Sequence, residues 1–156
     1  MQIKITLNGK PVTAEIQADT LLLDLLREQG CYSVKRGCET SNCGLCTVWL
    51  DQLPVLSCSV LAARADGHAI ITLEGVPKEA EAFSDYLAKE GADQCGFCSP
   101  GLILNVLAME RELTDPDEEQ ILEFLSGNLC RCTGYMGQLR AIRNYLKSRS
   151  KHEREV

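Results

Sequence analysis

Eight of the nine cysteines in this 156-residue chain fall into two sets of four, and each set lies in its own half of the sequence. The first set follows the pattern C-x4-C-x2-C, with a fourth cysteine after eleven intervening residues; its members are Cys38, Cys43, Cys46 and Cys58. The second set is a C-x2-C pair and, after thirty-one intervening residues, a C-x-C pair; its members are Cys95, Cys98, Cys130 and Cys132. The spacing of the first set is typical of plant-type 2Fe-2S ferredoxins. Two such sets in one chain predict a relay for single electrons.

The second set leaves other chemistries open. A C-x2-C pair with a distant cysteine pair is also a zinc-ribbon pattern. The spacing of Cys130 and Cys132 is tighter than in most zinc sites, and the ferredoxin pattern elsewhere in the chain favours iron. A thioredoxin-like role for Cys95 and Cys98 is weaker, because no β-α-β pattern precedes them. We interpret the ninth cysteine, Cys31, as a small buried residue.

Length and cysteine usage indicate two small metal-stabilised halves in a reducing compartment. Halves of about 75 residues have small cores, which metal clusters commonly stabilise. The odd cysteine count argues against a disulfide framework, and a strand pattern at residues 1–7 stands where a secretory signal would begin. We therefore expect a cytoplasmic protein.

Charge and hydropathy exclude two classes of partner. Sixteen basic and 22 acidic residues give a net charge of −6, which predicts no binding of nucleic acid through a basic surface. The basic stretch at residues 140–154 is expected to be a solvated helix face with a frayed tail. No apolar run approaches the roughly 20 residues that span a bilayer, so we expect no membrane span.

The first half is predicted to be a small sheet packed on one helix. Apolar residues alternate over 3–7 and 12–16 on either side of Asn8-Gly9, a strong hairpin turn. Asp19 or Thr20 is expected to cap a helix that stops at Gly30. Further strands are predicted at residues 47–50, 55–58 and 69–73.

The second half is predicted to be a helical bundle. After residues 75–77 strand alternation gives way to helical spacing, and we place the domain boundary there. Pro100 follows Ser99, so we expect Ser99 to be the N-cap of the helix that begins there. Helices are predicted over residues 80–90, 100–112, 116–125 and 137–147.

The cysteine sets and their neighbours resemble the iron-sulfur subunit of the molybdenum hydroxylases. This family includes xanthine dehydrogenase, aldehyde oxidoreductase, aerobic carbon monoxide dehydrogenase and related dehydrogenases of N-heterocycles. The resemblance covers nearly the whole chain. The segments that carry it are QCGFCSPG at 94–101, GNLCRCTGY at 127–135, KRGC at 35–38, CGLCTV at 43–48 and LEG at 73–75.

The resemblance implies an α+β chain with two cluster-binding domains. Residues 1–76 would form a β-grasp, plant-type ferredoxin-like domain whose four cysteines hold the distal 2Fe-2S cluster. Residues 77–148 would form an all-α four-helix-bundle domain whose four cysteines hold the proximal cluster, next to molybdenum. Residues 149–156 would form a charged C-terminal tail. No residue of this chain would be catalytic.

The resemblance also implies a function and partners. The chain would be the electron-transfer subunit of an oxidoreductase, passing electrons from a molybdopterin centre through both clusters to FAD. The holoenzyme would hydroxylate a purine, another N-heterocycle or an aldehyde with oxygen from water. Because the chain ends after the helical region, we expect molybdopterin on a large partner subunit and FAD on a medium one, in a dimer of heterotrimers. A free-standing ferredoxin-type carrier and a zinc-stabilised interaction module are the alternatives.

Individual positions both match and depart from the family pattern. Gln94 and Cys132 match, and the resemblance implies that both contact molybdopterin. Ser41 stands where the first loop usually has glycine, so we expect an altered loop geometry there. The other departures are Leu45 for alanine, Gln52 in place of an Asp-Gly turn, and Ser99 for threonine.

Overall fold

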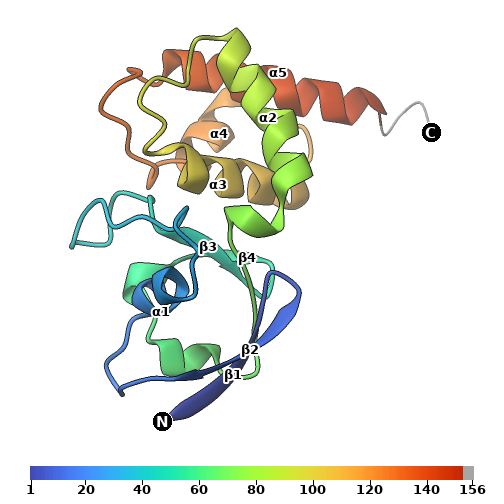
Figure 1. The fold of residues 1–156 in the computed structure, drawn as a ribbon. Coiled ribbons are helices and arrows are strands. Elements are labelled where there is room, and N and C mark those ends of the chain that lie inside the picture. Colours follow the sequence, from blue (N-terminus) through green and yellow to red (C-terminus); the bar gives the residue numbers. More distant parts are fainter. Residues whose placement is uncertain (153–156) are drawn as a thin grey trace.

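The computed structural model describes residues 1–152, and the first half of that range is a helix packed on a five-stranded sheet (Figure 1). The sheet order is β2-β1-β5-β3-β4, with β1 and β5 parallel and the other neighbours antiparallel. One helix, α1 (Leu22–Glu28), lies against it with four buried leucines. This is the β-grasp arrangement expected for the first half. The strands are β1 (Gln2–Leu7), β2 (Lys10–Glu15), β3 (Thr47–Leu50), β4 (Leu53–Leu56) and β5 (Ala69–Ile71).

Two tight turns set the registers of the hairpins. Asn8 and Gly9 both have positive φ, at 50° and 78°, as a two-residue turn between twisted strands requires. Asp51 and Gln52 adopt the same conformation, at 48° and 72°, although neither is glycine. The predicted first hairpin is confirmed, and the alternate residues of β1 are buried. The strand predicted at 55–58 is shifted, because Gln52 closes the turn early and β4 begins at Leu53.

The start of α1 differs from the prediction. Its N-cap is Leu21, which makes no side-chain cap, so neither Asp19 nor Thr20 caps the helix. The first helical N-H, that of Leu22, donates instead to the carbonyl of Val60 at 2.8 Å. A tertiary backbone partner therefore satisfies the donor that a side-chain cap would serve. The predicted stop is confirmed, because Gly30 follows the helix at φ 87°.

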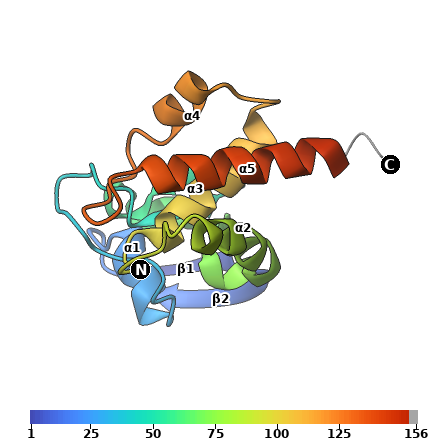
Figure 2. The same ribbon diagram turned by 90° about the horizontal axis from the view of Figure 1, so that it is seen from above.

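Four helices form the second half, as predicted. They are α2 (Pro77–Lys89), α3 (Ser99–Glu112), α4 (Glu118–Phe124) and α5 (Met136–His152). α3 lies between the sheet and α5, and the view from above shows α5 running across the helical layer (Figures 1 and 2). Short 3-10 turns at Ser57–Ser59, Ala62–Ala65 and Leu73–Gly75 complete the elements. α5 continues into the predicted tail, whose residues 153–156 lie outside the described residues.

The starts of α3 and α4 also differ from the prediction. Cys98, not Ser99, is the N-cap of α3, and the Ser99 hydroxyl donates to Asp93 Oδ1 at 3.0 Å. The hydroxyl thus braces the preceding loop instead of the helix. α4 begins with a capping box between Asp117 and Gln120, two residues later than predicted.

The halves have separate apolar cores joined through one tryptophan. The first core groups residues of the sheet and α1, and the second groups residues of the four helices. Trp49 of β3 belongs to the helical core, where its indole Nε1 donates to the carbonyl of Leu104 at 3.0 Å. The Arg111 guanidinium lies 3.7 Å from the centre of its ring. Trp49 therefore fixes the sheet against α3.

No helix within residues 1–152 is both long and apolar enough to cross a bilayer.

Candidate metal centres

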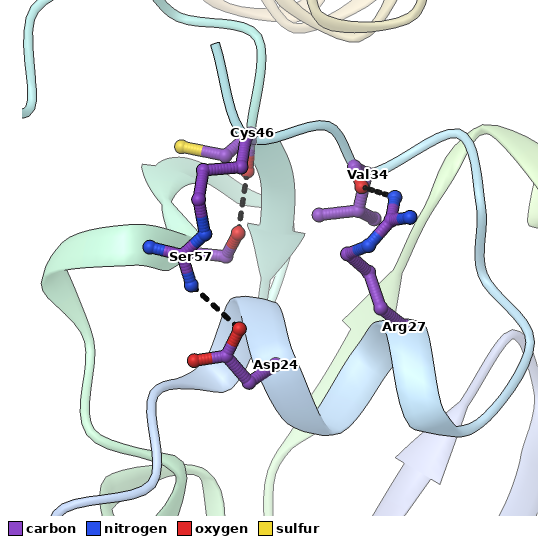
Figure 3. Close-up of polar contacts among 6 residues, drawn as sticks. Asp24, Arg27, Val34, Cys46 and Ser57 are labelled. Atoms are coloured by element: carbon purple, nitrogen blue, oxygen red, sulfur yellow. Dashed lines mark hydrogen bonds and ion pairs between the residues drawn. The ribbon is translucent and has the colours of Figure 1, made fainter. Parts of the chain in front are cut away.

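The β3-β4 hairpin and α1 hold the first cysteine loop between them. Cys46 immediately precedes β3, and Cys58 follows β4. The Ser57 hydroxyl donates to the carbonyl of Cys46 at 2.7 Å, which ties the two ends of the hairpin together (Figure 3). On the α1 side, Arg27 Nη1 donates to the carbonyl of Val34 at 2.8 Å (Figure 3). The entry and exit of the loop are therefore both anchored to regular structure.

The thiols of the first set approach one another in two pairs. Cys38 hydrogen-bonds with Cys43, and Cys46 with Cys58. Backbone N-H groups of the loop, those of Thr40 and Asn42 foremost, lower the pKa of Cys38 to about 6. Burial raises the pKa of Cys46 to about 11. Cys38 therefore favours the thiolate, whereas Cys46 holds its proton more tightly until a metal displaces it.

The second set forms two pairs as well. Cys95 and Cys132 lie with their sulfur atoms 3.5 Å apart, and Cys98 pairs with Cys130. The pKa of Cys98 is raised to about 11 by burial. The Phe97 backbone N-H lowers the pKa of Cys95, the more exposed partner. The second set thus has one pair at the surface and one pair deeper, whereas each pair of the first set joins a buried cysteine to a partly buried one.

This arrangement fits a two-iron cluster in each set. Two thiols for each of two irons is the ligand arrangement of a 2Fe-2S cluster. Cysteines of both sets also line one cavity of about 500 Å³; they are Cys38, Cys43, Cys95, Cys98, Cys130 and Cys132.

Comparison with known proteins agrees with this geometry. Residues 5–69 match the family described as "2Fe-2S iron-sulfur cluster binding domain", and residues 72–143 match the "[2Fe-2S] binding domain" family. The chain is 44% identical over 144 residues to the nicotinate dehydrogenase small FeS subunit of Eubacterium barkeri, covering 90% of this chain and 92% of that one. It is 47% identical over 140 residues to the xanthine dehydrogenase iron-sulfur-binding subunit of Escherichia coli O157:H7, covering 85% and 86%.

Solved structures agree in fold. Quinoline 2-oxidoreductase from Pseudomonas putida 86 superposes with a TM-score of 0.89 at 36% identity, covering 97% of this chain and 96% of that chain. The chain is one of the iron-sulfur subunits of the molybdenum hydroxylases. Aldehyde oxidoreductase from Desulfovibrio gigas matches with a TM-score of 0.88 at 36% identity, and there the iron-sulfur subunit corresponds to 17% of a longer chain. The predicted fold, the two 2Fe-2S clusters and the electron-transfer role are thereby confirmed.

The two cysteine loops of the iron-sulfur subunit touch through their main chains. The Leu129 N-H donates to the carbonyl of Cys43 at 2.9 Å, so one hydrogen bond joins Cys43 to the residue before Cys130. A Cβ added to Gly44 would lie 2.4 Å from the carbonyl oxygen of Gly127, and Gly44 has φ 72°. Only glycine permits this approach at Gly44. The spacing between the loops is therefore set by backbone contacts.

One cationic side chain also crosses between the loops. The backbone N-H of Lys35 donates to the Leu45 carbonyl in the first loop. Its ammonium group lies 3.3 Å from the carbonyl oxygen of Phe97 and 4.8 Å from the centre of the Phe97 ring, in the second loop. A positive charge between two anionic clusters reduces their mutual repulsion.

Ser41 has a left-handed backbone conformation, which glycine adopts more readily than serine. Its φ is 59°, and its hydroxyl lies 3.8 Å from Cys58 Sγ while accepting from Ser59 at 2.7 Å. This left-handed conformation is strained for Ser41, because serine has a Cβ atom and glycine does not. We expect Ser41→Gly to raise the free energy of unfolding by about 1 kcal/mol, measured by denaturant titration. Ser41→Ala, which keeps the strain and loses the hydroxyl, should show no gain; equal gains in both variants would contradict the strain.

The structure also locates Gln94 and two polar contacts that the sequence left unnoticed. Gln94 is exposed beside Cys95, although it does not line the cavity shared by the cysteine sets. The Thr133 hydroxyl donates to Cys130 Sγ at 3.2 Å, and the Gln138 amide donates to Cys98 Sγ at 3.7 Å. Neither position stands out in sequence, because a donor to sulfur has no fixed spacing from its cysteine.

Proposed function

We propose that the eight paired cysteines are the cluster ligands and that the second set faces the molybdenum centre of a large partner subunit. The first set would then pass electrons to FAD on a medium subunit. The clusters would supply one-electron storage between a two-electron substrate oxidation and flavin. The protein supplies the thiolates, the N-H donors and the fixed spacing of the loops. No side chain is assigned a role in substrate chemistry.

The apolar surface around the second set carries this proposal. Cys95 and Cys132 are exposed, in contrast to the buried Cys43 and Cys46 of the first set. The exposed apolar side chains of Phe97, Leu129 and Tyr135 line a cavity together with both exposed cysteines. Leu122 and Met136, which are also exposed, line an adjoining groove that shares Leu129 and Tyr135. Such a patch on one face is typical of a permanent interface and not of a free carrier. It supports docking of this face against the molybdopterin subunit.

The substrate class follows from the relatives. The names of these relatives include nicotinate, xanthine and caffeine dehydrogenases, and a solved relative is quinoline 2-oxidoreductase. All four compounds are N-heterocycles. We therefore propose that the complete enzyme hydroxylates an N-heterocycle, with an aldehyde as the second candidate, in the cytoplasm and as a dimer of heterotrimers.

Purification of the native complex tests the proposal. We expect large and medium polypeptides to co-purify with this chain, with molybdenum, FAD and about four irons per copy of it. N-heterocycles added without an electron acceptor should bleach the cluster absorbance, whereas aldehydes should do so more slowly. A monomeric chain without a molybdopterin subunit would contradict the proposal, and zinc in place of iron at the second set would support a structural module instead.

Gln94 is proposed to contact the pterin. We expect Gln94→Ala to keep both clusters and to slow reduction of the second cluster by substrate about tenfold, equivalent to about 1.4 kcal/mol, the size of one hydrogen bond. Stopped-flow absorbance of the complex measures this rate. Gln17→Ala, at another exposed glutamine, is the matched control. Equal rates in the two variants would remove Gln94 from the contact.

A further inference from the structure

Gln138 is a buried polar side chain in the first turn of α5. It is 5% exposed, and only a few polar residues of the described chain are buried to that degree. Its neighbours on the adjoining groove are mainly apolar, among them Leu102 and Leu139. A buried amide without a hydrogen bond costs a few kcal/mol, so the direction of its N-H group matters. That group points to Cys98 Sγ, 3.7 Å from Nε2.

Cys98 lies where solvent competes little with such a donor. It is half-buried at the N-cap of α3, and its carbonyl already accepts from Leu102 at 3.1 Å. A hydrogen bond in a poorly hydrated site is electrostatically stronger than one in water. The hydroxyls near Cys58 in the first set lie on exposed residues and compete with solvent.

We propose that Gln138 is a positioning residue that donates an N-H···S hydrogen bond to Cys98 and thereby raises the reduction potential of the second cluster. Reduction adds one electron and no proton, and the added negative charge spreads onto the sulfur ligands. A donor aimed at one of those sulfurs stabilises the reduced state more than the oxidised state. The inference rests on the proposed role of Cys98 as a cluster ligand.

Two variants without a donor separate hydrogen bonding from packing. Gln138→Leu has a branched side chain of similar volume, and Gln138→Met keeps the length and flexibility of glutamine. Asn144→Leu is the matched control, because it removes an exposed amide from the same helix that bonds Glu90 and not a sulfur. The readout is an EPR-monitored redox titration of the complete complex, in which the first cluster is an internal reference.

We expect both Gln138 variants to lower the ratio of reduced to oxidised second cluster about tenfold at a fixed potential, equal to about 59 mV for one electron. The first cluster and the Asn144→Leu complex should titrate as the wild type does. An unchanged second potential in both variants would overturn the inference, as would shifts that differ between leucine and methionine. If the wild-type complex shows no second EPR signal, the proposed ligand role of Cys98 fails instead, so the two failures are distinguishable.

Discussion

Replacing Gly101 by alanine is expected to lower the free energy of unfolding by about 3 kcal/mol. A Cβ at this position would lie 2.1 Å from the carbonyl oxygen of Gly44 and 3.3 Å from Leu45 Cα. Both are backbone atoms in the first cysteine loop, so neither can move aside as a flexible side chain would. Alanine gains roughly 1 kcal/mol in helix propensity in α3, but overpacking against main chain outweighs that gain. The first cysteine loop must move away from the start of α3, and so from the second cysteine loop, to accommodate the methyl group.

Thermal unfolding of the chain and its iron content measure this effect. Gly127→Ala is the matched control, because the Gly127 carbonyl also lies against Gly44 and a Cβ built on Gly127 meets nothing within 4 Å. We expect the control to keep nearly wild-type stability and full iron. In the Gly101→Ala complex, electron transfer between the clusters should also be slower, since separation of the loops lengthens the path. Equal melting temperatures for the two alanine variants would show that the loops tolerate separation.

Cys132→Ser is expected to remove the second cluster and to leave the first in place. Iron should fall from about four to about two atoms per chain, because serine is a poor substitute for thiolate. The first set is anchored by the β3-β4 hairpin and α1 and belongs to a different apolar core. Its EPR signal should therefore remain.

Cys31→Ala is the control for the loss of a cysteine as such. Cys31 is 5% exposed in the core of the first half, where the Asn8 amide lies 3.9 Å from its sulfur. We expect this variant to lose about 1 kcal/mol of stability and to keep both EPR signals. Loss of both signals in Cys132→Ser would contradict two independent clusters, and loss of iron in Cys31→Ala would give the ninth cysteine a role in assembly.

Local chemistry made much of this fold predictable. The Asn8-Gly9 turn needs positive φ at two successive residues, so the first hairpin could be read from sequence. Gly30 ended α1 for a similar reason. The N-caps of α1 and α3 could not be predicted, because Leu22 finds its acceptor at Val60 and Ser99 bonds Asp93. Those partners are brought close only by the tertiary fold.

The candidate site divides in the same way. Fixed spacings identified the two cysteine sets, since each loop must present thiols at short range. The interactions between the sets are non-local: Lys35 reaches Phe97, and Leu129 reaches Cys43. Trp49 likewise anchors the sheet to α3 through Leu104, fifty-five residues away in the sequence. Sequence spacing carries no information about such contacts.

The hydrogen bond from Leu129 to Cys43 has a consequence for how this subunit can diverge. Because main-chain atoms make it, side-chain replacement at either residue leaves the bond itself available. Gln138, the proposed positioning residue of the second cluster, lies outside it. Mutations can therefore retune the energy levels of the two carriers for a new oxidant or substrate while the tunnelling gap between them stays constant. Because the distance between the clusters and their reduction potentials depend on different residues, the same subunit can serve enzymes that oxidise different molecules.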